Sequence, residues 1–338
     1  MRRLRAALLL AALAAGASPA AAQLLPGLVQ LQPPARTIDG LTRQGDLAYA
    51  AYQAGRYHEA FRLAMRRIEL DPADAAAMTL LAELLAQGLG VRPDDAAAAQ
   101  WYGLAAARGD ANAQFALALM RLEGRGGPRD EAAARDLLAQ AAAKGHGPAA
   151  FNLALPLLAS GGEAELQQAI PLLRQAAEQE IGDAQHALAV LMLEGRGLPK
   201  DEEAGADMMA RAAANGSLAG EVEFAILQFA GRGIGRDERA AARGFWRAAQ
   251  RGNAIAQNRL ARILLQGRWL PRDPVRAVGW HLAARSQGLA DEALEAELLR
   301  LTPEDREKAE AFAQDQVTGA ALTKPAAQAQ SSPSEFRR

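Results

Sequence analysis

Five aspartates recur along the chain and are the first candidates for acid–base chemistry. They stand at Asp94, Asp130, Asp201, Asp237 and Asp273. Carboxylates that act as general acid and base work as a pair in one cleft, whereas one carboxylate per regular step is typical of residues that start helices. Asp130 is followed by Glu131, which suits the positive first turn of a helix. We therefore predict that these aspartates are helix N-caps and not catalytic groups.

The other chemistry-bearing residues suggest no site. The four histidines lie far apart in the sequence and lack the spacing of metal ligands, as in H-E-x-x-H. The stretch GRGIG at 231–235 is not G-x-G-x-x-G and has no phosphate-binding lysine, and the chain has no cysteine nucleophile. We predict no catalytic residue, no metal and no cofactor. The histidines are His58, His146, His186 and His281.

Glycines separated by one residue mark a repeat of about 36 residues. The sequence LEGRG occurs at 122–126 and returns at 193–197, which is 71 positions later, or two steps less one residue. The intervening copy, 147–182, has ASGG in place of G-x-G, so we treat it as degenerate. In the last copy Trp269 takes the place of the second glycine. The pairs are Gly88/Gly90, Gly124/Gly126, Gly195/Gly197 and Gly231/Gly233, with Gly267 alone in the last copy.

Each copy predicts two helices joined by a turn. The segment ANAQFALALMRLEG places apolar residues at helical spacing. Gly124 suits the left-handed residue that ends this helix, and Gly126 would keep the next turn tight. The second helix would begin after Asp130 and end before Gly145. Such a pair buries its apolar face only against neighbouring pairs, so the expected fold is an all-α solenoid (superhelix) of antiparallel helix pairs.

The pattern L-A…G-x-G…D…A-A…G resembles the Sel1-like repeat of the tetratricopeptide-like superfamily, in an exported bacterial form. Six such repeats would cover residues 74–290, and residues 41–73 resemble a single tetratricopeptide unit. Residues 291–316 predict C-terminal capping helices, the second opened by Thr302 as N-cap. The resemblance implies an extended concave surface for a protein or peptide partner. Because no catalytic constellation is visible in the sequence, we expect no enzymatic activity.

The chain begins with the features of a secretory signal peptide. Three arginines precede an Ala-Leu run, and small residues stand before Gln23, so residues 1–22 would be removed on export to a bacterial periplasm. No later stretch could serve as a stable membrane anchor. The Pro-containing segment 23–40 and the Ala, Gln, Ser and Pro-rich tail 317–338 have the composition of disordered segments.

The charge balance argues against nucleic acid as a partner. The chain holds 38 basic and 39 acidic residues, and removing three arginines with residues 1–22 leaves a formal charge of −4. There is also no basic cluster interleaved with aromatic residues. We expect a monomer.

Three hypotheses for function follow from the sequence. The first is a periplasmic adaptor or scaffold that binds a protein or peptide. The second is a glycan-binding protein, which would need exposed aromatic side chains with carboxylates or amides in one groove. The third is a hydrolase acting on cell-wall material with the solenoid as its frame, although no nucleophile with its base is visible.

Two tryptophans are the candidate partner-binding residues. Trp269 stands at a glycine position, and Trp246 follows Gly244 and Phe245, where the second helix holds an aromatic residue in Trp101 and Trp280. If Phe245 takes over that site in the core, Trp246 should face away from its own helix pair. Trp is enriched at binding hot spots. The alternative is that both tryptophans pack against an adjacent repeat or the C-terminal cap.

Overall fold

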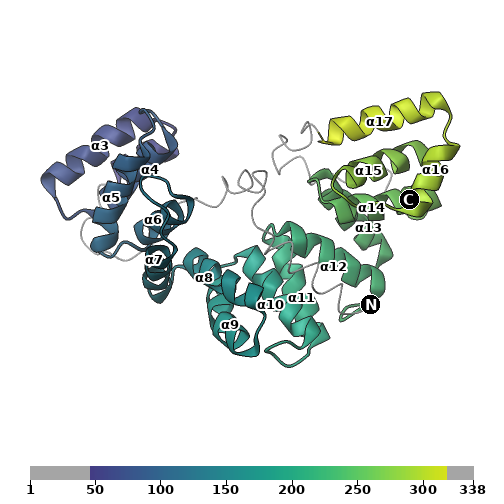
Figure 1. Cartoon of the computed structure of the whole chain (residues 1–338), viewed down its shortest axis with the longest axis horizontal. Coiled ribbons are helices and arrows are strands. Elements are labelled where there is room, and N and C mark those ends of the chain that lie inside the picture. The colour runs from purple at the N-terminus through teal and green to yellow at the C-terminus, as the bar shows by residue number, and fades with distance from the viewer. Residues whose placement is uncertain (1–45, 318–338) are drawn as a thin grey trace. The chain divides into compact units, whose positions relative to one another are not determined.

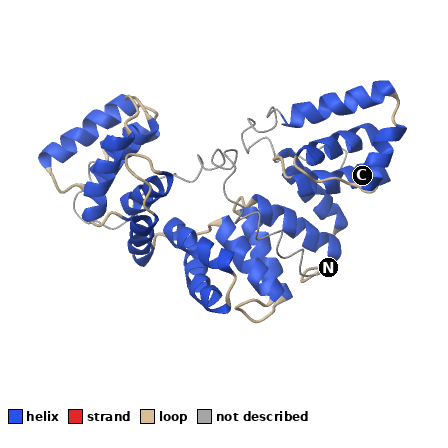
Figure 2. Cartoon of the chain, in the orientation of Figure 1, coloured by secondary structure: helices blue, strands red, loops and turns tan. Residues whose placement is uncertain are grey.

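The computed structural model describes residues 46–317, and every regular element within that range is an α-helix (Figures 1 and 2). The predicted signal peptide at 1–22, the linker at 23–40 and the tail beyond Val317 lie outside the described residues. Between residues 46 and 317 no helix is both long enough and apolar enough to cross a membrane.

The helices follow one another with short connections. The N-terminal pair is α2 (Leu47–Gln53) and α3 (Tyr57–Leu70). Six pairs follow: α4 (Ala75–Gln87) with α5 (Asp95–Ala107), α6 (Ala111–Glu123) with α7 (Glu131–Ala143), α8 (Gly147–Ser160) with α9 (Glu163–Glu178), α10 (Gly182–Glu194) with α11 (Glu202–Ala214), α12 (Leu218–Ala230) with α13 (Glu238–Gln250), and α14 (Ala254–Gln266) with α15 (Pro274–Ser286). The last helices are α16 (Glu292–Arg300) and α17 (Pro303–Val317).

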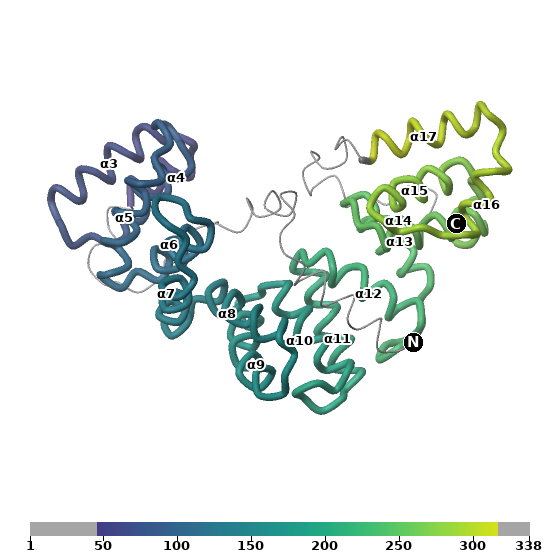
Figure 3. The backbone as a smooth tube through the Cα atoms, viewed as in Figure 1, coloured from purple at the N-terminus to yellow at the C-terminus, as the bar shows by residue number. Residues whose placement is uncertain are grey.

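These helices form two compact units, and the division falls inside α9, after Ala176. Within each unit the chain runs back and forth, so that consecutive helices pack as antiparallel neighbours (Figure 3). This arrangement confirms the predicted all-α class of antiparallel helix pairs. The degenerate copy also forms a helix pair, α8 and α9, in spite of Pro156 and Pro171 inside its helices.

The helix ends follow the sequence prediction. Gly124 ends α6 in the left-handed region at φ 71°, and the Asp130 carboxylate accepts a hydrogen bond from the Ala133 N–H at 2.9 Å, at the start of α7. Asp110 caps α6 in the same way, through the Ala113 N–H at 2.7 Å. The side chains that cap a second helix of a pair are those of Asp94, Asp130, Asp201, Asp237 and Asp273.

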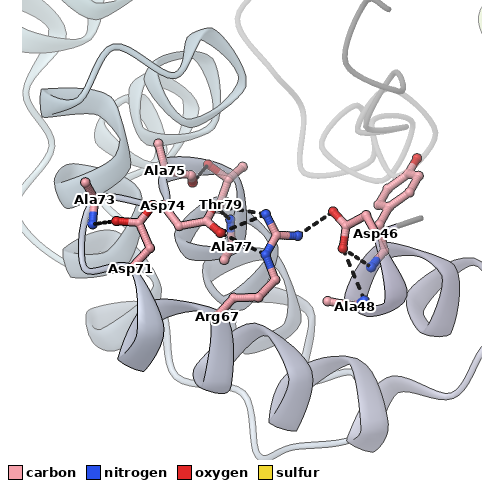
Figure 4. A network of polar contacts seen from close by, with 10 residues as sticks. Asp46, Ala48, Arg67, Asp71, Ala73, Asp74, Ala75, Ala77 and Thr79 are labelled. Carbon is pink, nitrogen blue, oxygen red and sulfur yellow. Dashed lines mark hydrogen bonds and ion pairs between the residues drawn. The ribbon is translucent and has the colours of Figure 1, made fainter. Parts of the chain in front are cut away.

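The N-terminal pair is joined to the first repeat through one arginine (Figure 4). The Arg67 guanidinium lies 2.5 Å from the Asp46 carboxylate, and its Nε donates to Asp74 at 2.8 Å. Asp46 is the N-cap of α2 and Asp74 is the N-cap of α4. Arg67 therefore fixes the starts of two helices against α3.

The G-x-G loop contacts the preceding repeat, which the sequence interpretation of a tight turn did not include. A Cβ on Gly126 would lie 2.3 Å from the Asp95 carbonyl oxygen at the start of α5, so only glycine fits there. Between the two glycines, Arg125 donates to the Asp95 carboxylate at 2.6 Å. Equivalent arginine–acid pairs, also thirty residues apart, are Arg232 with Glu202 and Arg268 with Glu238.

The core combines small residues with a buried polar link. Many alanines on both helices are completely buried, which allows the helices to approach closely. Gln185, also completely buried, donates to the Ala177 carbonyl at the end of the preceding helix and accepts from Asn215, the C-cap of α11. Gln114 and Gln257 occupy the same position and bind Ala106 and Ala249. Each of these carbonyl oxygens also accepts a backbone N–H, from Gly109, Glu180 or Gly252, so the glutamine adds a second hydrogen bond at the end of the preceding helix.

Candidate functional site

The four histidines each lie against a different neighbour. His146 caps α8 by accepting from the Ala149 N–H at 3.1 Å, His186 lies 3.7 Å from Glu223, and His281 contacts Glu295 at 3.0 Å. His58 lies 3.3 Å from the Gly90 carbonyl oxygen. Each histidine thus has a separate environment, and the described part of the chain contains no group of three or more potential metal ligands.

The most strongly buried acid pairs with a tyrosine inside the first repeat. The Tyr102 hydroxyl donates to Glu83 at 2.5 Å, and Gln87 donates to the other carboxylate oxygen. Burial raises the pKa of Glu83, while the hydrogen bond from Tyr102 opposes that rise. Both side chains are only 2% exposed, so this pair joins α4 to α5 within the core and does not face a cleft.

The best-formed cavity lies in the second unit, between α12 and α14, and we call it the α12–α14 pocket. Its volume is about 440 Å³, within the range typical of ligand pockets. Phe245 of α13, which is 2% exposed, and residues of the loop after α14 also line it. The lining residues are Ile226, Phe229, Ala230, Phe245, Arg259, Arg262, Ile263, Gln266, Arg268 and Trp269.

Trp269 lines this pocket from a strained backbone position. Its φ is +67°, in the left-handed region that costs a non-glycine residue about 1–2 kcal/mol, and the earlier copies place glycine there. The side chain is 44% exposed. Its indole N–H donates to Glu238 at 3.2 Å, and the Arg268 guanidinium lies 6.0 Å from the ring centre. The indole is therefore held at the pocket by Glu238 and Arg268 while much of it faces solvent.

Two arginines at the pocket are held in place by acids. Arg262 lies 2.5 Å from Asp291, the N-cap of α16, and Arg268 lies 2.5 Å from Glu238 in α13. The side chains of Asp291 and Glu238 are 2% and 9% exposed, whereas about half of each arginine side chain remains exposed. A guanidinium has five N–H donors in a fixed plane, so one carboxylate does not exhaust it. Arg262 and Arg268 can therefore each donate a hydrogen bond to a second carboxylate.

Trp246 does not line the pocket. It is half-buried and packs at the edge of the core cluster that contains Phe245. Phe245 is buried, but it does not replace a missing aromatic residue: it belongs to a buried position one residue later, shared with Tyr102 and Met209. Gly244 is required because a Cβ there would lie 2.9 Å from the Ala225 side chain of α12. Of the two candidate tryptophans, only Trp269 lines the α12–α14 pocket, and Trp246 packs against the core.

The sequence analysis missed Phe229, Arg259 and Arg262, because these positions vary between copies and belong to no recurring column. They could have been recognised by comparing the first helix of each pair, because α12 and α14 carry aromatic or basic residues at positions where other copies have aliphatic ones. Phe229 is 36% exposed, and within the described residues it is one of several large apolar side chains that face solvent. A second, more open hollow lies along α3, but its lining comes from that helix alone, between Phe61 and Leu70.

Comparison with known proteins gives one family match. The family model of the Sel1 repeat matches residues 75–110, 111–146, 147–180, 182–217 and 254–289, together more than half of the chain. The degenerate copy is among these matches. The helix pair α12–α13, which forms one side of the pocket, is not. No curated protein matches the sequence significantly.

Two solved structures show the same fold. A Sel1 repeat protein from Oxalobacter formigenes is 25% identical, with a TM-score of 0.62, and the match covers 70% of this chain and 95% of that one. A protective antigen of uropathogenic Escherichia coli with an SLR fold is 24% identical, with a TM-score of 0.53, over 82% of this chain and 68% of that one.

Proposed function

The chain belongs to the Sel1 repeat family, and we propose that it is an exported scaffold whose α12–α14 pocket docks a protein or peptide partner. Proteins of this class typically mediate protein–protein interactions, and they are generally not catalytic. The observation that carries the proposal is Trp269, an exposed indole at a pocket, in a backbone conformation that favours glycine. Strain of this kind is concentrated at functional sites.

Glycan binding is the second candidate, and the pocket supports it less well. Neutral sugars are bound by aromatic faces together with carboxylates or amides that accept and donate hydrogen bonds. The pocket offers Phe229 and Trp269 as aromatic residues, but its polar lining consists of three arginines and only one amide, Gln266. This composition favours an acidic partner.

We also propose that the protein is a monomer in a bacterial periplasm. A periplasmic protein would have lost residues 1–22 and would begin at Gln23. The intact mass of the protein recovered from the native host should correspond to a chain that starts at Gln23. A mass that includes residues 1–22 would contradict export with cleavage.

Paired capture experiments test the docking function. Wild-type protein and the Trp269→Gly variant, which restores the glycine of the other copies, are used as baits in the same extract, and retained proteins are identified by mass spectrometry. We expect at least one protein that wild type retains and the variant does not. Leu299→Ala provides the control, because Leu299 is an exposed apolar residue of α16, 77% exposed, outside the pocket. Identical sets for wild type and Trp269→Gly would contradict docking at this pocket.

A further inference from the structure

The α12–α14 pocket combines an apolar interior with a basic rim. Ile226, Phe229 and Ile263 line it together with the buried Phe245, and these side chains offer no hydrogen bond to a ligand. Arg259, Arg262 and Arg268 also line it, and the acids that pair with Arg262 and Arg268 are not among the lining residues. Such a site matches a bulky apolar side chain accompanied by negative charge.

We infer that the pocket binds a short peptide segment in which one bulky apolar side chain is flanked by aspartate or glutamate. The inference rests on the proposed docking function and specifies the chemistry of the partner. The apolar side chain would enter between α12 and α14 and contact Phe229 and Trp269. The flanking carboxylates would accept hydrogen bonds from the exposed N–H groups of Arg262 and Arg268, as carboxylates do from planar guanidinium groups.

The acids around the pocket support this charge preference. Glu238 and Asp291 are each held behind an arginine, with side chains 9% and 2% exposed, and Glu223 of α12 lies beside His186. About half of the Arg262 side chain and half of the Arg268 side chain are exposed, whereas their partner acids are nearly covered. A carboxylate can therefore bind N–H groups of these two arginines that the existing ion pairs do not use.

Trp269 is a hot-spot residue for binding, and the packing of the helices does not depend on its indole. The other intact copies fold with glycine at this position, and the contacts of the indole described above are those with Glu238 and Arg268. Trp269→Gly should therefore leave the fold intact and remove one apolar wall. This separates a binding role from a structural one.

An array of seven-residue peptides tests the inference with purified protein. The central residue is Phe, Leu or Gly, the flanking residues are Asp/Glu, Ser or Lys, and affinities of the best peptides are measured by fluorescence anisotropy. We expect peptides with central Phe or Leu and acidic flanks to bind at least tenfold more tightly than their Lys-flanked or Gly-centred counterparts. Equal affinity for acidic and basic flanks, or no binding of either, would overturn the assigned chemistry.

Variants locate the binding. Trp269→Gly should lower the affinity for the acidic peptide at least tenfold with a melting temperature that is unchanged or raised, and Arg262→Gln should lower it with a smaller preference for acidic flanks. Leu299→Ala should change neither. Trp246→Ala should lower the melting temperature, with affinity following the folded fraction. An affinity that Trp269→Gly leaves unchanged would overturn the assignment to this pocket.

Two further results separate this inference from the proposed function. If Trp269→Gly abolishes capture of a cellular protein while no acidic peptide binds, docking holds and the peptide chemistry is wrong. If an acidic polysaccharide such as alginate binds in a Trp269-dependent way and the peptides do not, the ligand is an anionic glycan and the peptide inference is overturned.

Discussion

His146 caps α8 with an imidazole nitrogen, and this makes the start of that helix sensitive to acid. Nδ1 accepts the Ala149 N–H only while the ring is neutral, and the ring packs 4.8 Å from that of Phe115. Burial lowers the pKa of His146 from 6.5 to about 4. Between pH 6.5 and about pH 4 the unfolded chain binds more protons than the folded chain. The stabilisation that the neutral His146 ring contributes is therefore complete above pH 6.5 and is lost as the pH falls towards 4.

We predict that His146→Asn removes this pH dependence, because asparagine caps helices well and does not titrate. Wild type should lose on the order of 2 kcal/mol more than the variant between neutral pH and pH 4, allowing for solvent at this partly exposed site. Urea denaturation at the two pH values measures the difference. Equal losses in both proteins would show that His146 does not control the acid response.

Asp130 illustrates a cap with one local partner. Asp130→Ala removes the hydrogen bond to the Ala133 N–H and should lower the free energy of unfolding by about 1 kcal/mol. Asp136→Ala is the control, since Asp136 is an exposed residue within the same helix. If Asp130→Ala instead impairs partner capture while the melting temperature stays constant, the carboxylate has a binding role.

At the scale of the element, the second glycine of a G-x-G loop packs closely against the helix pair that precedes it, as Gly126 and Gly233 do. Gly126 and Gly145 both have positive φ, 69° and 86°, but a Cβ would strike the Asp95 carbonyl at Gly126 and meet nothing within 4 Å at Gly145. Gly145→Ala should therefore cost about 1 kcal/mol from the backbone alone, and Gly126→Ala about 3 kcal/mol or more. Chemical denaturation of the two variants compares them. Equal costs would mean that the loop yields without disturbing α5.

How much of each element the sequence predicts depends on repetition. Gly124 and Asp130 recur in several copies, so their conformations could be predicted and are confirmed. The role of the buried glutamines was missed because a single Gln per helix has no helical signature, and only its recurrence at Gln114, Gln185 and Gln257 distinguishes it. The pocket was missed for the opposite reason: Phe229 and Arg262 do not recur in other copies, and they come together only because α13 packs against both α12 and α14.

At the scale of the whole molecule, stability should be local, because each helix pair of a repeat protein contacts only its neighbours. Gly233→Ala places a Cβ 1.9 Å from the Glu202 carbonyl oxygen in the second unit. We predict that hydrogen exchange becomes faster between residues 182 and 266 and is unchanged between 46 and 143. Gly216→Ala, where a Cβ meets nothing, should have a smaller effect. Uniform acceleration along both ranges would show that the chain unfolds as one cooperative body.

The arginine–acid pairs that cross from one repeat to the preceding one also restrict how the array can change in length. Arg125, Arg232 and Arg268 each find their partner thirty residues earlier. Duplication or deletion of a complete 36-residue module preserves that interval, whereas a single inserted residue within it does not. A protein lengthened by a second copy of residues 111–146 would bring its added arginine to Glu131, the first residue of α7. Recombination and engineering should therefore both succeed in whole modules cut between one second helix and the next first helix.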